Sequence, residues 1–401
     1  MQSNQIIKSK NNHRSWGLGL FALAVFLLAG LSGCGPLELT GASGVSDAEA
    51  TIIAESNPAP EGEETGPVAT PQPAATEESP AMQPAPAEPT IALPHGWVAY
   101  LSKSNSGKGA EIMLVNMTAL SEAIALTNDG SAKTNLSWSP DGQYIAYSAN
   151  PDNSWNLYLM RVSDGSITRL TNSPAKDAWP DWSPDGRTIA FETFRDGNFE
   201  IYAIDVATLA ETRLTNSAAG DGRPTWSPDG RWIVFVSNRD GNANLYRMDA
   251  NGGNVVRLTT SEAAPDTGPA WSPDSQWITF TARRDGNPEI YKMRFDGSQQ
   301  QRLTSNNAND DHSSWSPDGQ KIIYLSGNNG AKKIMLMNAD GSNPQVIGET
   351  GDDHSAPVWS PGGDFLVYKG SGEVIYMLDL DGNVRPISPG GHIASEPAWG
   401  P

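Results

Sequence analysis

Apolar residues after residue 95 occur in short runs, and turn-forming residues separate each run from the next. In the unit that starts at Asp181, one run ends at Trp182, and others lie at residues 189–191, at 201–204 and around Leu214. Short runs bounded by Pro, Gly, Asn and Asp predict β-strands joined by tight turns. Each unit therefore predicts four antiparallel strands, and no segment of this region has a helical pattern longer than about two turns.

The unit recurs with a period of 44 or 45 residues, and a tryptophan marks each copy. Five of the copies read Trp-Ser-Pro-Asp and a sixth reads Trp-Ser-Pro-Gly, in which proline and the following glycine favour a tight hairpin turn. Four antiparallel strands repeated at this period predict the blades of a β-propeller. The six tryptophans are Trp138, Trp182, Trp226, Trp271, Trp315 and Trp359.

The two ends of the repeat region predict how the ring closes. The apolar second strand occurs seven times, but the first copy lacks its tryptophan strand, and Trp399 begins a clipped copy that consists of nothing else. A C-terminal strand that completes the first blade accounts for both ends and removes exposed sheet edges. We therefore predict an all-β, seven-bladed propeller over residues 95–401, with six or eight blades as the alternatives.

These units resemble the TolB-like β-propeller repeat, whose signature is Trp-Ser-Pro-Asp-Gly followed by Ile-Ala-Phe and Ile-Tyr. Ser275 and Gly362 each depart from the signature in one turn. The resemblance covers residues 95–401 and implies a propeller that acts as an interaction module. TolB also has an N-terminal α/β domain, which this sequence replaces with a tether, so the contacts of that domain are not implied. The full signature phrase begins at Trp138, Trp182, Trp226 and Trp315.

Residues 1–33 have the pattern of a secretory signal peptide, because basic residues precede an apolar run that ends in small residues. The only cysteine, Cys34, follows Leu-Ser-Gly, and this phrase resembles the lipobox of bacterial lipoproteins. The resemblance implies cleavage before Cys34 and attachment of a diacylglyceryl group to its sulfur. An uncleaved transmembrane anchor is the alternative, because about 19 apolar residues could just span a bilayer. Both interpretations export the rest of the chain.

Residues 34–94 are rich in Pro, Ala, Thr and Glu, with ten acidic residues and no Lys or Arg, which predicts a disordered tether. The formal charge of −19 divides into +3 for the signal peptide, −10 for the tether and −12 for the propeller. This balance argues against nucleic acid as a partner. We expect a monomer that a lipid anchor holds to a membrane, on the periplasmic or cell-surface side, and that binds an envelope protein or polymer.

Motifs for several kinds of catalysis are absent from the sequence. Related propellers serve as gating domains of serine oligopeptidases, but no Gly-x-Ser-x-Gly elbow occurs. A Walker loop and a Gly-x-Gly-x-x-Gly fingerprint are also missing. We therefore expect a non-enzymatic binding protein without a cofactor.

An aspartate stands five residues before the tryptophan in four consecutive units, where the connection between blades reaches the central channel. Each aspartate could cap its own loop, as short carboxylate side chains do. The alternative is an electronegative mouth that binds a cation or a basic group. Trp155 and Trp179 lie on the same face outside the repeat phase and are further contact candidates. The four aspartates are Asp177, Asp221, Asp266 and Asp310.

His312, His354 and His392 lie in three successive segments of this face, the first two beside aspartates. Histidine with carboxylates suits a divalent transition metal, and some propeller lyases with similar repeats hold a metal through histidines at such a place. The distances to the following tryptophan differ, at three, five and seven residues, so the spacing alone does not bring the three together. The alternative to the binding protein is therefore a metal-dependent lyase acting on an acidic polysaccharide, or another propeller enzyme that uses these histidines.

Overall fold

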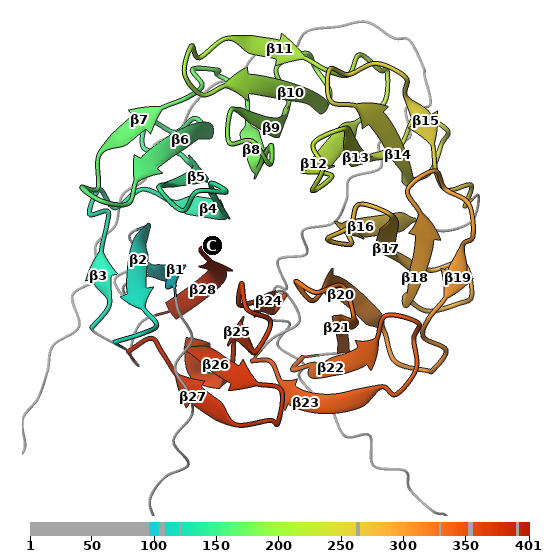
Figure 1. The fold of residues 1–401 in the computed structure, drawn as a ribbon. Helices are drawn as coiled ribbons and strands as arrows, with labels where there is room; N and C mark the ends of the chain where they lie inside the picture. Colours follow the sequence, from blue (N-terminus) through green and yellow to red (C-terminus); the bar gives the residue numbers. More distant parts are fainter. Residues whose placement is uncertain are drawn as a thin grey trace, which may run out of the picture. The chain divides into compact units, whose positions relative to one another are not determined.

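The computed structural model describes residues 96–103, 109–119, 122–261, 265–328, 330–351, 356–389 and 393–401. These residues form seven four-stranded antiparallel sheets, which are arranged as blades around a central opening (Figure 1). The only helical element among them is the short 3-10 helix η1 (Ser371–Glu373). The fold is a seven-bladed β-propeller, and the predicted number of blades is confirmed.

Each blade contributes one strand to each of four concentric sets. The innermost strands are β4 (Lys133–Trp138), β8 (Asp177–Trp182), β12 (Asp221–Trp226), β16 (Asp266–Trp271), β20 (Asp310–Trp315), β24 (Val358–Trp359) and β28 (Ile393–Trp399). The second strands are β1 (Trp97–Lys103), β5 (Tyr144–Ala149), β9 (Thr188–Thr193), β13 (Trp232–Ser237), β17 (Trp277–Ala282), β21 (Lys321–Ser326) and β25 (Phe365–Lys369). The third strands are β2 (Ala110–Asn116), β6 (Asn156–Arg161), β10 (Glu200–Asp205), β14 (Asn244–Asp249), β18 (Glu289–Arg294), β22 (Lys333–Asn338) and β26 (Ile375–Asp379). The outer strands are β3 (Ile124–Ala125), β7 (Ile167–Arg169), β11 (Glu211–Arg213), β15 (Val256–Arg257), β19 (Gln301–Arg302), β23 (Gln345–Glu349) and β27 (Val384–Pro386).

The C-terminal strand closes the ring, as the sequence predicted. Strand β28 pairs antiparallel with β1 and becomes the innermost strand of the first blade, whose order is β28-β1-β2-β3. Trp399 lies opposite Val98 in this pairing. In Figure 1 the last strand, in dark red, lies beside the first, in teal. The first blade therefore combines strands from both ends of the propeller sequence.

Four of the seven recurring tryptophans join neighbouring blades by a hydrogen bond from the indole N–H. The indole N–H of Trp182 donates to the backbone carbonyl of Ser137, the residue directly before the tryptophan of the preceding blade, at 3.2 Å. The same bond joins Trp138 to Ala398 at 3.1 Å, so it also crosses the point where the ring closes. Because most of these rings are also buried, with Trp182 only 6% exposed, the tryptophans are structural residues rather than ligand contacts.

The Ser-Pro-Asp-Gly phrase forms the turn from the first strand to the second. The Ser139 hydroxyl donates to Asp141 Oδ1 at 2.6 Å, and Gly142 has a φ of +67° and donates its N–H to the Ser139 carbonyl at 2.9 Å. Ser275, which replaces the glycine in one copy, adopts a φ of +60° and makes the equivalent bond to Ser272 at 2.9 Å. The departure from the repeat therefore changes one residue and leaves the turn intact.

The hydrophobic core lies in layers between adjacent blades. In one layer Leu101 and Ile112 of the first blade pack against Ile145 and Tyr147 of the second, and each is at most 1% exposed. Burial of apolar surface is the main driving force of folding. Since each blade supplies one side of two layers, the stability of the ring depends on its closure.

Candidate functional site at the central channel

Two kinds of segment meet on one face of the propeller: the turns between the second and third strands, and the connections from an outer strand to the next innermost strand. We call this the crossover face, and those sequence-predicted aspartates and tryptophans that the structure describes lie on it. Asp177, Asp221, Asp266 and Asp310 are the first residues of β8, β12, β16 and β20, and each is 0% exposed. Their carboxylates are therefore enclosed by the protein.

In three blades the buried aspartate is paired with the arginine of the Arg-Asp-Gly-Asn turn in the same blade. The arginine also lies over an aromatic ring: the Arg239 guanidinium is 4.7 Å from the ring centre of Tyr246. The Tyr246 hydroxyl in turn donates to Asp240 of the turn. The pairs, with their Nη2–Oδ2 distances, are Arg195–Asp177 (3.2 Å), Arg239–Asp221 (2.6 Å) and Arg284–Asp266 (2.6 Å).

The fourth blade of this series lacks the arginine. Asp310 instead accepts a hydrogen bond from Asn306 Nδ2 at 2.7 Å, and burial raises the pKa of its carboxyl. All four aspartates thus bind side chains of the turns and loops on the crossover face. They do not form the exposed electronegative mouth that was one of the two interpretations of the sequence, because the protein encloses each carboxylate.

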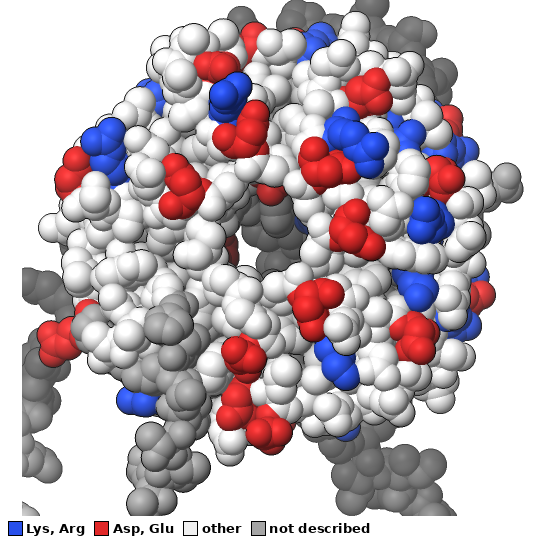
Figure 2. Space-filling model, viewed as in Figure 1, with Lys and Arg blue, Asp and Glu red and all other residues white. Residues whose placement is uncertain are grey.

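Acidic side chains surround the central opening in the view along the channel (Figure 2). On the face opposite the crossover face, Asp141, Asp185 and Asp318 of the Ser-Pro-Asp turns are exposed. A hydrogen bond from the serine of the same turn lowers the pKa of each of these carboxyls. They are therefore ionised at neutral pH and disfavour anionic ligands on that face.

The innermost strands carry a second recurring feature, a backbone irregularity three residues before the tryptophan. In six of the seven strands the residue at this position has a positive φ. A β-bulge accompanies it, for example between Gly222 and Thr225 of β12. We call this set the collar row, and we call the residues directly before the tryptophans the inner row. The collar row is Asn135, Trp179, Arg223, Gly268, His312, Ala356 and Glu396, and the inner row is Ser137, Asp181, Thr225, Ala270, Ser314, Val358 and Ala398.

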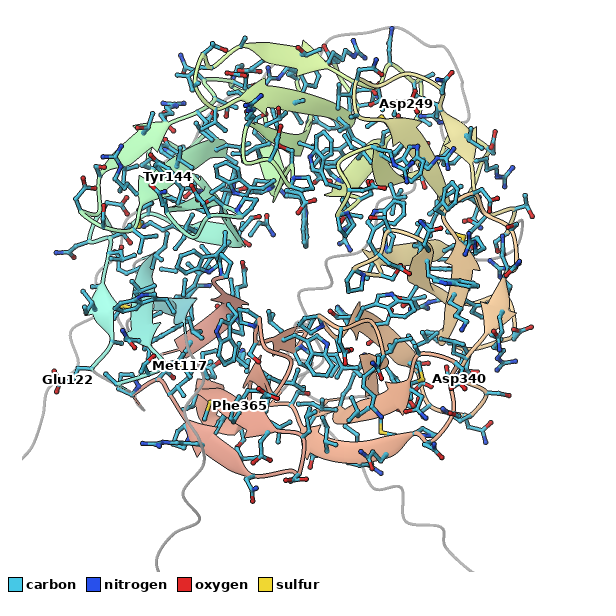
Figure 3. All side chains as sticks on the ribbon, viewed as in Figure 1. Met117, Glu122, Tyr144, Asp249, Asp340 and Phe365 are labelled. Atoms are coloured by element: carbon cyan, nitrogen blue, oxygen red, sulfur yellow. The ribbon has the colours of Figure 1, made fainter. Side chains whose placement is uncertain are left out.

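Five of the seven residues between the two rows are buried, for example Pro180 and Pro224, while every inner-row residue is partly exposed, so we infer that both rows face the channel. Side chains of the innermost strands project into the central opening in Figure 3. The two rows are the positions of these strands at which a side chain can contact a ligand in the channel.

The collar row is the candidate site, because several of its residues adopt a backbone conformation that is energetically unfavourable for their residue type. Positive φ suits Gly and Asn, whereas other residues incur about 1–2 kcal/mol. Yet φ is +55° at Trp179, +52° at Arg223, +55° at His312 and +49° at Glu396. Such strain concentrates at functional sites. The sequence interpretation missed Arg223 and Glu396, although a varied residue at a fixed offset from each tryptophan was a signal for them.

Side chains of the collar row connect neighbouring blades. Glu396 Oε2 accepts the backbone N–H of Asn135 at 2.5 Å, and Glu396 Oε1 accepts the Thr134 hydroxyl at 2.6 Å. Further round the ring, the Arg223 guanidinium lies 4.7 Å from the ring centre of Trp179, which is 39% exposed. The collar therefore combines an exposed aromatic ring and a cation that come from adjacent blades.

Two carboxylates of the third blade bind the backbone of β12 directly. Glu192 Oε2 accepts the N–H of Arg223 at 3.0 Å, and Asp181 Oδ2 accepts the N–H of Trp226 at 2.7 Å. Burial raises the pKa of Asp181 to about 7 and also raises the pKa of Glu192. Protonation of these groups therefore occurs closer to neutral pH than is usual for carboxyls, beside the strand that carries Arg223.

His312 lies in the collar row, and its Nδ1 is 2.8 Å from Asp311 Oδ1. The other oxygen of Asp311 accepts from Lys332 Nζ at 2.6 Å. Burial alone would raise the pKa of Asp311, but the contacts with His312 and Lys332 lower it. His354 and His392 lie outside the described residues, so their place relative to His312 stays a prediction. Among the described residues no three His, Cys, Asp or Glu side chains are grouped to hold a metal ion.

Aromatic residues gather on the crossover face of the second and third blades. The carbonyl of the half-buried Trp155 accepts the N–H of Asp177 at 2.9 Å, which places its loop beside the start of β8. Phe194, in the next blade's turn, is 45% exposed and packs edge-on against Phe199 at 5.0 Å. Its N–H donates to the carbonyl of Lys176, the neighbour of Asp177. Of the two tryptophans predicted as contacts, Trp179 is thus the more exposed.

Cys34, the apolar run before it and the tether lie outside the described residues, so the lipid anchor stays a prediction. In the part of the chain that the structure describes, no helix is long and apolar enough to cross a membrane.

A family model described as the TolB beta propeller domain matches residues 89–198, 178–265 and 257–401. The chain belongs to this family. The Tol-Pal system protein TolB of Francisella tularensis is 29% identical over 79 residues, which are 19% of this chain and only 18% of the relative. The crystal structure of TolB from Acinetobacter baumannii has a TM-score of 0.52 at 22% identity, covering 76% of this chain and 67% of that one.

The propeller is also similar to an oligogalacturonate lyase solved in complex with manganese. The TM-score is 0.56 at 16% identity, and the match covers 74% of this chain and 86% of the lyase. At such identities this lyase and the Acinetobacter TolB establish the fold alone. The family assignment therefore rests on the match of the repeat units.

Proposed function

We propose that this chain is an exported, non-enzymatic binding protein whose propeller contacts another cell-envelope protein with the channel mouth of its crossover face. The observation that carries this proposal is the collar row. Its backbone suits Gly or Asn, yet Trp179, Arg223, His312 and Glu396 occupy it. Membership of the TolB propeller family supports an interaction module.

The chemistry of the crossover face supports recognition. Trp179 and Phe194 offer exposed aromatic surface, and large aromatic residues with arginine are enriched at the centres of protein interfaces. Arg223 adds a cation beside that surface. The lipid on Cys34 and the acidic tether belong to the same proposal, since they would hold the propeller near a membrane while leaving it free to reach a partner.

Site-specific photo-crosslinking in intact cells tests the contact surface. A photoreactive phenylalanine analogue replaces Phe194 on the crossover face or, as the matched control, Ile167 on the outer strand β7 of the adjacent blade. The two native side chains are 45% and 44% exposed, so the positions differ in place rather than in accessibility. We expect a discrete crosslinked protein from position 194 that is lost in the Trp179→Ala background. Equal crosslinking at both positions, or none at position 194, would contradict the proposal.

A further inference from the structure

We propose that the group recognised at the collar is a single carboxylate of an extended polypeptide, bound by the Arg223 guanidinium against the ring of Trp179. This inference rests on the proposed function, because it names the chemistry of the partner at the same face. It concerns the seam between the third and fourth blades, where β8 supplies Trp179 and β12 supplies Arg223.

The propeller contains three internal examples of the complex that we propose. Arg195, Arg239 and Arg284 each lie over a tyrosine ring, at 4.7, 4.7 and 4.9 Å from its centre. Each of these arginines also binds a carboxylate of its own blade. A guanidinium can serve both partners, because its face stacks on the ring while its edge donates to carboxylate oxygens.

At the collar the arginine and the ring are present, but among the described residues no carboxylate is bound to the guanidinium. The Arg223 guanidinium lies 4.7 Å from the Trp179 ring centre, the same spacing as in two of the internal examples. Arg223 is exposed, and among the described residues its guanidinium contacts the Trp179 ring without an ion pair to an acidic side chain. The Glu192 carboxylate of the third blade accepts the backbone N–H of Arg223 and is only 7% exposed; it interacts with the charge of Arg223 but makes no hydrogen bond to the guanidinium. The edge of the guanidinium is therefore free for a ligand.

The charges of the channel favour one carboxylate over a chain of them. Arg223 is the single Lys or Arg in the collar and inner rows, which also contain the acidic residues Asp181 and Glu396. A polyuronate carries a carboxylate on every sugar, so its further charges would meet these acids and the acidic exterior of the protein. The exposed rings of Trp179 and Phe194 suit an apolar residue beside the acid. A polypeptide supplies that combination.

Selection from a random heptapeptide phage library on the immobilised full-length protein tests the inference. We expect the recovered peptides to be enriched in Asp or Glu next to an aromatic or aliphatic residue, and we expect counter-selection on Arg223→Gln to remove that enrichment. Two synthetic forms of the best peptide, with a free or an amidated C-terminus, distinguish a terminal carboxylate from a side chain. A galacturonate oligomer included as a competitor tests the polysaccharide. Its binding in preference to the peptides would overturn the proposal.

Calorimetric titration then isolates the contact. Arg223→Gln retains the length of the side chain and removes the charge, and Arg187→Gln removes an exposed arginine from the opposite face as the matched control. Because charge-assisted hydrogen bonds are among the stronger ones, we expect Arg223→Gln to weaken the acidic peptide about tenfold or more and to leave its Asp→Asn analogue unchanged. The carboxylate site would be refuted if Arg223→Gln weakened both peptides equally, or if the phage selection recovered no acidic peptide.

The outcomes separate this inference from the proposed function. If position 194 crosslinks a partner and Arg223→Gln leaves that crosslink intact, the face binds a protein but the carboxylate contact is wrong. If no partner crosslinks while acidic peptides bind through Arg223, the site exists and the proposed protein partner is wrong.

Discussion

The structure predicts whether replacing Asp181 raises or lowers the stability of the propeller at a given pH. Burial raises the pKa of this inner-row carboxyl from 3.8 to about 7. The folded state therefore holds the proton more tightly than the unfolded chain, so the stability linked to Asp181 is complete below about pH 4 and is lost as the pH rises to about 7. We expect Asp181→Asn to stabilise the propeller at pH 8 and to leave its stability at pH 4 nearly unchanged. An asparagine oxygen can still accept the N–H of Trp226.

The size of the effect follows from the shift. About 3 pKa units at 1.36 kcal/mol each correspond to roughly 4 kcal/mol as an upper bound. Because Asp181 is partly exposed to the channel, water stabilises its charge, and about 2 kcal/mol is the expected gain at pH 8. For a domain of this size that gain corresponds to an increase in Tm of about 4 °C.

Thermal unfolding followed by circular dichroism at pH 4.5 and pH 8 measures this gain. The control is Asp185→Asn, because the hydrogen bond from Ser183 lowers the pKa of that exposed carboxyl. Asp185 stabilises the fold above its unfolded pKa, so its replacement should have the opposite sign and lower Tm at pH 8. The reasoning about Asp181 is refuted if Asp181→Asn is no more stable than the wild type at pH 8, or if its gain is the same at both pH values.

Three further predictions concern the loops, the anchor and the metal. Arg239→Met leaves the Asp221 carboxylate buried without its cation and should cost about 3 kcal/mol in chemical denaturation, whereas Arg231→Met removes a surface pair and should cost under about 1 kcal/mol. Cys34→Ser should move the protein from the membrane to the soluble fraction or leave it unprocessed, as fractionation and mass spectrometry would show; unchanged membrane retention contradicts the lipid anchor. Elemental analysis of the purified protein should find no stoichiometric metal, and manganese or zinc that is lost on His354→Ala would favour the lyase instead.

The periodic part of the sequence predicted the fold because each recurring residue has a structural role that it fulfils through contacts within the same chain. Trp182 binds the preceding blade, Gly142 closes a turn, and Trp399 completes the first blade. The site was harder to predict. Asp177 recurred near the channel, but its pairing with Arg195 depends on a turn 18 residues away that folds back over the same blade. Sequence spacing alone did not reveal that this carboxylate would be enclosed.

Comparison of the repeats also indicates which collar-row residues have the weakest structural reason for being there. A positive φ at each bulge would be met at lowest cost by Gly or Asn in every copy, as at Gly268. Glu396 is partly explained, because its carboxylate joins β28 to β4 through two hydrogen bonds. His312 has Asp311 as a partner. The guanidinium of Arg223 stacks on the ring of Trp179 and interacts with the charge of the nearby Glu192. That contact leaves both side chains exposed and offsets little of the free energy that a positive φ costs at these two residues. Binding of a ligand is therefore the better explanation for the pair.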